Sequence, residues 1–293
     1  LVAGTRSSGK TSFMGSLLLE IMRRYRVLTI EDTLELNVDA MKKLGYNIQP
    51  LKVRAALAKG GAEVPADEGI RTSLRLGDSA LIVGEIRSTE AVALFEAMRI
   101  GASANVVAGT IHGDSPYGVF DRVVNDLKVP KTSFKATDII VMCAPVISAD
   151  GLHKFRRVTS ITEVRKKWED DPMQEGGFVD LMKYNPKTDE LEPTSELLNG
   201  DSEVIKSIAG EVKDWAGNWE AVWENILLRT ELKKLLIEKG EKNSSLLEAP
   251  FVVQANDEFR RISDQVKEEA GSLDSKFILR EWKKWLEKNA KRV

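Results

Sequence analysis

The sequence predicts an α/β fold for the first half of the chain, followed by a β-hairpin and a mostly helical C-terminal extension. Three observations lead to this prediction. A glycine-rich loop of phosphate-binding type stands near the start, and short apolar runs alternate with amphipathic stretches as far as about residue 146. After Ser195 the sequence has helical character to its end. The alternation is typical of βαβ units that build a largely buried sheet with flanking helices.

The glycine-rich loop matches the pattern G-x-x-x-x-G-K-[ST] at every position. Its glycines allow successive backbone N–H groups to point into a concave nest that holds phosphates. The stretch 12–25 predicts a helix whose N-terminus lies under those phosphates. We therefore expect the chain to bind a nucleoside triphosphate with Mg²⁺. The residues expected to bind it are Gly4, Thr5, Arg6, Ser7, Ser8, Gly9, Lys10, Thr11 and Ser12.

The rest of the first half predicts strands and helices in alternation. The expected strands are 27–30, 79–83, 104–111 and 138–142. The expected helices between them are 38–44, 67–76, 89–100 and 117–127. Further on, 155–164 and 177–184 are strand-like runs. The second run is followed by the turn residues 185–189 and then Leu191, which predicts a β-hairpin.

This order of elements predicts three segments: a core at 1–165, a hairpin and connecting segment at 166–198, and a helical extension at 199–293. All six tryptophans lie beyond residue 165. Trp215, Trp219 and Trp223 recur four residues apart, and 226–227 continue the stripe, which predicts a packing face on one helix.

Composition excludes several classes of protein. The 293 residues are 42% hydrophobic and 30% charged with a net charge of −2, so no basic excess points to nucleic acid as a partner. The single cysteine, Cys143, excludes an internal disulfide and a cysteine-based zinc site, and it follows an apolar run typical of a buried strand. We expect no signal peptide, and no apolar run in these 293 residues is long enough to cross a bilayer. The loop begins so early that we expect a preceding N-terminal portion.

Acidic residues follow two of the predicted strands. Glu85 comes after the apolar run 81–83 and Gly84, and a strand-end glutamate lies in the crevice where open α/β sheets bind ligands. It can orient an attacking water or accept its proton, unless it is an ordinary strand-terminal acid. Three acids, Glu31, Asp32 and Glu35, follow the predicted strand 27–30. Acids this close repel one another unless Mg²⁺ neutralises them or water solvates them.

One histidine and several arginines complete the candidate chemistry. His112 ends the strand 104–111 and can bond a γ-phosphate or a catalytic acid, although a lone histidine is more often structural. Phosphoryl transfer commonly uses an arginine to stabilise charge on the transferred group. Arg71 and Arg75 would share one face of a helix, or form a solvated pair. The candidate arginines are Arg54, Arg71, Arg75 and Arg87.

The order of these motifs resembles the type II/type IV secretion ATPases, the motors of pili, archaeal flagella, general secretion and conjugation. The glycine before Glu85, where most P-loop proteins have Asp, is the most specific mark, and Gly-Glu-x-Arg with Leu74-Arg75 is similar to the archaeal branch. The resemblance covers about residues 1–165. The motifs that carry it are Gly4–Thr11, Ile30-Glu31-Asp32-x-x-Glu35, Gly84-Glu85-Ile86-Arg87 and Gly109-Thr110-Ile111-His112.

The resemblance implies a RecA-like ATPase core in a homo-hexameric ring, with ATP and Mg²⁺ held between this domain and a preceding N-terminal domain. It implies phosphate binding by Lys10, a catalytic acid at Glu85, and coupling of the γ-phosphate by His112. Thr11, Glu31 and Glu85 would support the metal, with Glu31 also near the water. Arg71 and Arg75 would contact the nucleotide, the acidic box (Ile30-Glu31-Asp32-x-x-Glu35) or a neighbouring subunit. No N-terminal domain and no zinc-binding cysteine module is present, and the tail after Ser195 matches no motif of the family.

The function that we expect is an ATP-hydrolysing motor for protein secretion or for assembly of a type IV pilus or archaellum-like filament. It would work in the cytoplasm, peripheral to the inner face of the membrane, with a membrane platform protein as partner and the helical tail as docking module. Two alternatives stay open: a nucleic-acid-translocating ring ATPase, and a scaffold that binds ATP and barely hydrolyses it.

Overall fold

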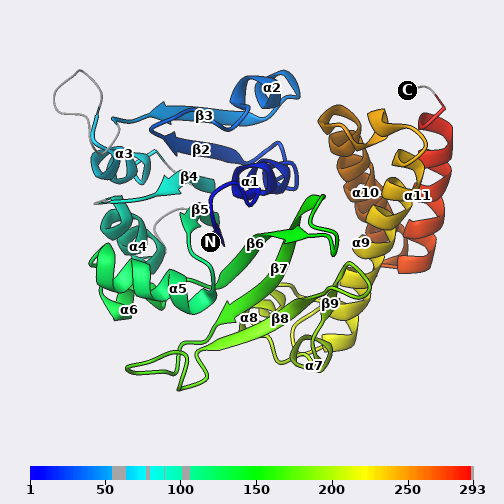
Figure 1. Cartoon of the computed structure of the whole chain (residues 1–293). Coiled ribbons are helices and arrows are strands. Elements are labelled where there is room, and N and C mark those ends of the chain that lie inside the picture. The colour runs from blue at the N-terminus through cyan, green and yellow to red at the C-terminus, as the bar shows by residue number, and fades with distance from the viewer. Residues whose placement is uncertain (55–63, 77–79, 89, 101–105, 292–293) are drawn as a thin grey trace. The chain divides into compact units, whose positions relative to one another are not determined.

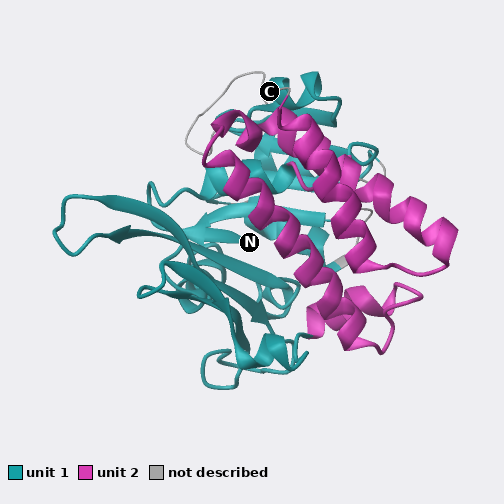
Figure 2. Ribbon diagram, turned by 90° about the vertical axis from the view of Figure 1, so that its right-hand side faces the viewer, with its two compact units in different colours: residues 1–18, 23–202 teal, residues 19–22, 203–293 magenta. Residues whose placement is uncertain are grey.

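The computed structural model describes residues 1–54, 64–76, 80–88, 90–100 and 106–291 (Figure 1). The chain forms two compact units (Figure 2). Unit 1 contains Leu1–Leu18 and Arg23–Ser202, and unit 2 contains Leu19–Met22 and Glu203–Val293. These two units are groups of residues that pack compactly together, and they do not test the three predicted domains, which stay a prediction.

Unit 1 is built on one sheet with the strand order β3-β2-β4-β5-β1-β6-β7-β8-β9. The pairs from β3 to β6 are parallel, and those from β6 to β9 are antiparallel. Only β5 separates β1, which leads into the glycine-rich loop, from β4, which carries Glu85. The strands are β1 (Val2–Gly4), β2 (Arg26–Glu31), β3 (Asn47–Lys52), β4 (Ala80–Ile86), β5 (Val106–His112), β6 (Ile139–Ile147), β7 (Lys154–Val164), β8 (Phe178–Asn185) and β9 (Glu190–Pro193).

Helices cover the parallel part of this sheet on both faces, with α1 on one side and α3, α4 and α6 on the other (Figure 1). An aromatic cluster of Phe95, Phe120, Phe134 and Trp168 fills the core under α4, α5 and α6. The helices of unit 1 are α1 (Lys10–Leu18), α2 (Val38–Lys43), α3 (Ala66–Ser73), α4 (Glu90–Ile100), α5 (Pro116–Asp121), the π-helical η1 (Arg122–Asp126), α6 (Lys131–Phe134) and α7 (Ser195–Leu198). The α/β prediction is confirmed.

Unit 2 is helical, and its core runs between α9, α10 and α11. Leu228, Leu232 and Leu236 of α9 face this core, and the buried Trp282 indole donates a hydrogen bond to the Ala255 carbonyl at 3.0 Å. Its helices are α8 (Glu203–Gly210), α9 (Trp219–Gly240), the 3₁₀ turn η2 (Ser244–Leu247), α10 (Ala249–Ala270) and α11 (Ser275–Asn289). Among the described residues, no helix has the length and apolar character needed to span a bilayer.

The predicted tryptophan stripe is wrong as the main packing face of α9. Trp215 precedes the helix, and Leu227 at the end of the stripe is 49% exposed. Trp219 and Trp223 are half-buried and stack on each other instead. Val222 is the first buried residue of α9, and the buried row Leu228, Leu232 and Leu236, one residue beyond Leu227, packs in the core with α10 and α11.

Several predicted boundaries also needed correction. The helix expected over 12–25 ends at Leu18, and the carbonyls of Leu19 and Glu20 accept side-chain hydrogen bonds from Asn256 and Arg260 of unit 2. The helix expected over 117–127 changes to π-helical geometry after Asp121. The strand β3 was not predicted. The hairpin of β8 and β9, and the burial of Cys143, are confirmed.

Candidate nucleotide-binding site

The glycine-rich loop joins β1 to α1 and has the backbone shape that its residue types require. A side chain at Gly4 would place its Cβ 2.1 Å from the Cys143 carbonyl oxygen, so only glycine fits at the end of β1. Ser7 and Gly9 have positive φ angles of 63° and 95°, which turn the loop back toward the start of α1. The local sequence therefore produces a curled loop of N–H groups at a helix N-terminus.

The Lys10 ammonium lies inside this curl. It donates hydrogen bonds to the carbonyl oxygens of Gly4 at 2.9 Å and Thr5 at 2.8 Å. Burial lowers the pKa of Lys10, partly offset by the negative charge of Glu85. A buried cation of this kind gains from an anion beside it, and a phosphate group meets that need.

Glu31, at the end of β2, is 2% exposed. Its Oε1 accepts hydrogen bonds from the backbone N–H groups of Glu35 and Leu36, each at 3.0 Å, while its Oε2 is buried and has no hydrogen-bond partner among the described residues. Burial is the main cause that raises the pKa of Glu31, against the lowering effect of those two hydrogen bonds. The free oxygen is available to a cation or to a water in the site.

Gly84 makes room for this glutamate. A Cβ at Gly84 would lie 2.8 Å from Glu31 Cγ and 3.4 Å from its Oε1. The carboxylate of Glu31 therefore lies beside the position from which a side chain on β4 would otherwise enter the site. The position of Glu31 in the acidic box therefore depends on the missing side chain at Gly84 of the Gly-Glu-x-Arg motif.

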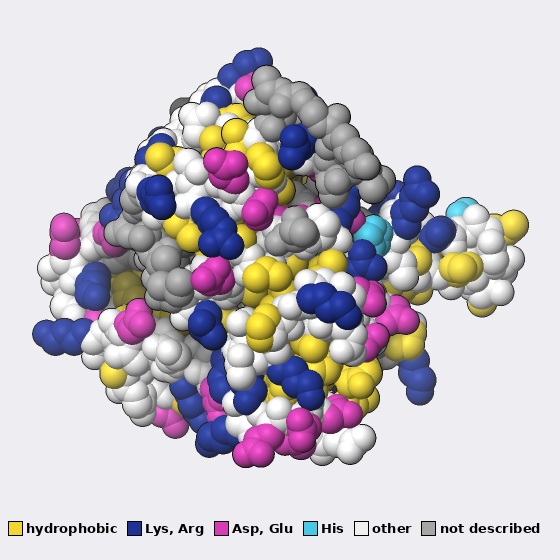
Figure 3. Space-filling model, turned by 90° about the vertical axis from the view of Figure 1, so that its left-hand side faces the viewer, with side chains coloured by type: hydrophobic (Ala, Val, Ile, Leu, Met, Phe, Trp, Pro, Cys, Tyr) yellow, Lys and Arg dark blue, Asp and Glu magenta, His cyan; other side chains and the backbone are white. Residues whose placement is uncertain are grey.

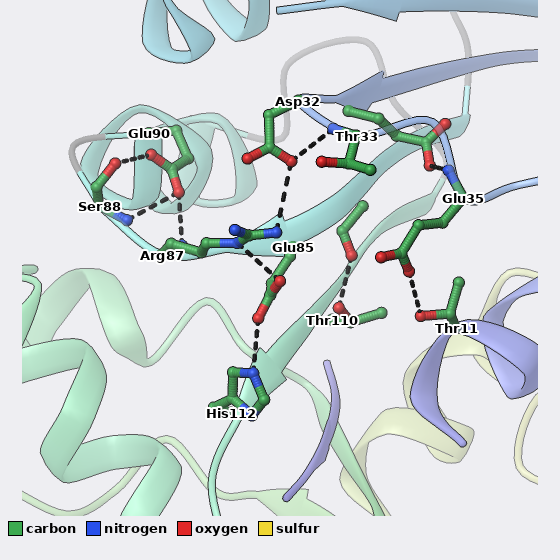
Figure 4. Close-up of polar contacts among 12 residues, drawn as sticks. Thr11, Asp32, Thr33, Glu35, Glu85, Arg87, Ser88, Glu90, Thr110 and His112 are labelled. Atoms are coloured by element: carbon green, nitrogen blue, oxygen red, sulfur yellow. Dashed lines mark hydrogen bonds and ion pairs between the residues drawn. The ribbon is translucent and has the colours of Figure 1, made fainter. Parts of the chain in front are cut away.

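Glu85 is held on both of its carboxylate oxygens (Figure 4). His112 Nε2, at the end of β5, lies 2.9 Å from Oε1, and Arg87 Nε lies 2.7 Å from Oε2. Arg87 also reaches Asp32 Oδ1 with Nη2 at 3.5 Å. Three strand ends that are separate in the sequence therefore meet in one chain of polar contacts.

A further hydrogen bond links the loop to the acidic segment. The Thr11 hydroxyl donates to Glu35 Oε2 at 2.8 Å. On the other side, the Thr110 hydroxyl donates to the Gly84 carbonyl at 2.5 Å, which ties β5 to β4 beside Glu85. The predicted metal residue Thr11 thus already faces carboxylate oxygens.

These side chains line a cavity of about 410 Å³, within the size range of ligand sites. Its acids need a cation and its lysine needs an anion, and a metal–triphosphate complex supplies both. Within the described ranges no group of three or more histidine, cysteine or acidic residues is arranged to hold a metal ion. The lining residues include Arg6, Ser7, Lys10, Thr11, Glu31, Asp32, Glu35, Gly84, Glu85, Arg87 and His112.

Arg71 and Arg75 do not line this cavity. The prediction that they share a helical face is wrong, because α3 ends at Ser73 and Arg75 follows in a turn. Arg71 is exposed and lies 3.6 Å from Glu96 of α4. Arg87, a weaker candidate in the sequence, is the arginine that reaches Glu85. The pairing of Arg87 with Asp32 was missed, since nothing in the spacing of these residues indicates it.

Comparisons with known proteins agree with the motifs. A family model described as "Type II/IV secretion system protein" matches residues 1–162. The uncharacterized protein MJ1287 of Methanocaldococcus jannaschii is 29% identical over 213 residues, which cover 71% of this chain and 72% of that protein. Protein VirB11 of Agrobacterium fabrum is 29% identical over 171 residues, 57% of this chain and 46% of that protein.

Among solved structures, the VirB11 ATPase of the Brucella suis type IV secretion system, in complex with sulphate, is similar with a TM-score of 0.43 and 22% identity. That match covers 55% of this chain and 47% of the other. The chain therefore spans about half of the length of VirB11 proteins.

Proposed function

Because this chain belongs to the family of type II/IV secretion system ATPases, we propose that it is the ATP-hydrolysing core of a secretion motor. The observation that supports this best is the position of Glu85. It lies in the same cavity as Lys10 and Thr11, and each of its carboxylate oxygens is held by a second residue. A site that only binds nucleotide has no need of such a restrained carboxylate.

In this proposal the residues have separate tasks. Lys10, which now bonds two backbone carbonyls, would bind phosphate oxygens, and Thr11 and Glu31, whose Oε2 has no partner among the described residues, would hold the metal. When bound, Mg²⁺–ATP supplies the phosphoanhydride and neutralises charge on the leaving group. Glu85 orients the attacking water and accepts its proton, and His112 keeps the carboxylate in position.

The test uses Lys10→Ala and Glu85→Gln in the complete protein, with Glu96→Gln as control. Glu96 is a half-exposed glutamate of α4 that pairs with Arg71 of α3 and does not line the cavity. Lys10→Ala should lose nucleotide binding, because the phosphates lose their buried cation. Glu85→Gln should still bind ATP but turn over at least about 100-fold more slowly, the usual contribution of a general base. Glu96→Gln should match the wild type.

A Glu85→Gln protein with a near-normal ATPase rate would contradict the assignment of Glu85. A wild-type protein that binds ATP and shows no hydrolysis in a single-turnover assay would favour the scaffold alternative. Over the face seen in Figure 3, basic and acidic side chains are interspersed, and the sequence as a whole has a net charge of −2. The absence of a basic excess over the sequence favours the secretion motor over a nucleic-acid-translocating ring.

We further propose the assembly and its place in the cell. The motor would be a homo-hexamer at the cytoplasmic face of the membrane, driving a type IV pilus, an archaellum-like filament or secretion through a membrane platform protein. Analytical ultracentrifugation tests the ring directly. Deletion of residues 200–293 should keep ATP binding and lose membrane recruitment if the helical tail is the docking module; unchanged recruitment would refute that role.

A further inference from the structure

Arg156 lies against the phosphate-binding loop, although it is 145 residues or more away from it in the sequence. Its Nε donates a hydrogen bond to the Ser7 carbonyl oxygen at 3.1 Å, a contact that spans 149 residues of chain. Its side chain also covers the loop glycine: Arg156 Cδ is 3.2 Å from the position that a Cβ on Gly9 would take.

The sheet explains how a residue of β7 reaches the loop. Gly4, the last residue of β1, pairs with Cys143 of β6. Beyond that pair β6 continues to Ile147, and Pro145 in this extension pairs with Arg156 of β7. The β6–β7 ribbon therefore runs past the carboxyl end of β1, where the loop begins, and it carries Arg156 to the loop.

Within the described part of the chain, no acid neutralises the charge of Arg156. Among the described residues no carboxylate forms an ion pair with it, and the only hydrogen bond that its guanidinium makes there uses Nε, so the four N–H groups of its two terminal nitrogens keep donor capacity. Its neighbour Arg157, on the opposite face of the same strand, is different. Arg157 pairs with both carboxylate oxygens of Asp189 at 2.7 Å. An exposed arginine beside a phosphate-binding loop, with no acid to hold it, fits an anionic ligand.

We propose that Arg156 is a nucleotide-binding residue that contacts the part of the nucleotide shared by ATP and ADP. This inference rests on the proposed function. Lys10, Thr11 and Glu85 line the acidic cavity, which takes the metal and the γ-phosphate, whereas Arg156 is not part of that lining. Because Arg156 lies against Ser7 and Gly9 but outside that lining, the proposal assigns its guanidinium to the phosphates that ATP and ADP share.

The test measures the affinity of the complete protein for fluorescent ADP and ATP analogues in Arg156→Ala, Arg156→Lys and Arg157→Ala. Arg156→Ala should weaken both nucleotides by a similar factor of about 10 or more, because one charge-assisted contact is lost with either. In steady-state hydrolysis the loss should fall mainly on KM. Arg156→Lys should recover part of the affinity through its charge, and Arg157→Ala should behave as the wild type.

Three results would overturn the inference. One is unchanged affinity for ADP in Arg156→Ala while the wild type binds normally. Another is a loss for ATP alone, which places the residue at the γ-phosphate. The third is a fall in kcat without a change in KM, which indicates that Arg156 acts only by shaping the loop through Ser7. A wild-type protein that binds neither nucleotide would instead refute the proposed function.

Discussion

Substitution of Gly84 by alanine tests the packing on which the candidate site depends. The new Cβ would stand 2.8 Å from Glu31 Cγ, whereas ordinary contacts begin near 3.4 Å, so the glutamate has to move by about 0.6 Å. Glu31 cannot move freely, because its Oε1 accepts two backbone hydrogen bonds. Overpacking and weakened hydrogen bonds together should lower the free energy of unfolding by about 2–4 kcal/mol.

The second arm of this experiment removes the obstacle. In a Glu31→Ala background the nearest remaining contact of the new Cβ is Cβ of residue 31 at 3.5 Å, which is ordinary. The backbone of Gly84 is outside the left-handed region, so alanine meets no strain there. In that background Gly84→Ala should be neutral or slightly stabilising, since alanine loses less chain entropy on folding than glycine.

Equilibrium urea unfolding, followed by circular dichroism, gives the four free energies of this double-mutant cycle. The reasoning predicts a coupling energy of at least about 2 kcal/mol between residues 84 and 31. It is refuted if Gly84→Ala destabilises both backgrounds equally, or if the single variant is as stable as the wild type. ATPase rates on the same proteins add a second reading, because a displaced Glu31 should also reduce hydrolysis.

Three further predictions concern pH and packing. Burial raises the pKa of Glu31 above its ordinary value of 4.5, so ionisation of this side chain weakens the fold as pH rises through the raised pKa. Glu31→Gln should therefore be more stable than the wild type at neutral pH. Urea unfolding at a series of pH values should show this advantage disappear below about pH 4.5. Trp282→Phe should lower the free energy of unfolding by about 1–3 kcal/mol more than Trp168→Phe. The reason is that the Trp282 indole N–H donates a hydrogen bond, whereas that of Trp168 finds no acceptor among the described residues. Equal losses of stability in thermal melts would contradict this. The Arg157 guanidinium and the Tyr184 hydroxyl hold the pKa of Asp189 at about 2, so the pairing stabilises the β8–β9 hairpin above the ordinary pKa of 3.8 and is lost as pH falls through 2. In Arg157→Ala an NMR titration should move the Asp189 pKa toward 3.8, and an unshifted value would show that the ion pair is not its cause.

The predictions that succeeded rest on rules that act over a few residues. The loop between β1 and α1 has the turned backbone that its glycines predict, and the strand that carries Glu85 begins with an apolar run at 80–83. The missed strand β3 shows the limit of such rules. It contains Pro50, which argues against a strand in the middle of a sheet, but β3 is at the edge, where the missing N–H is tolerated.

By itself, the sequence determined the α/β core, the glycine-rich loop between strand and helix, and the set of acids at the strand ends, because each depends on neighbouring residues. The tertiary structure alone decided which of those groups touch. The strand order brings His112 and Arg87 to opposite oxygens of Glu85, places Glu31 in the space left by Gly84, and leaves Arg71 outside the cavity. The extension of β6 and β7 past β1 brings Arg156 to Ser7. These contacts join residues far apart in the chain, and their pairing follows from sheet order and register, which no local pattern encodes.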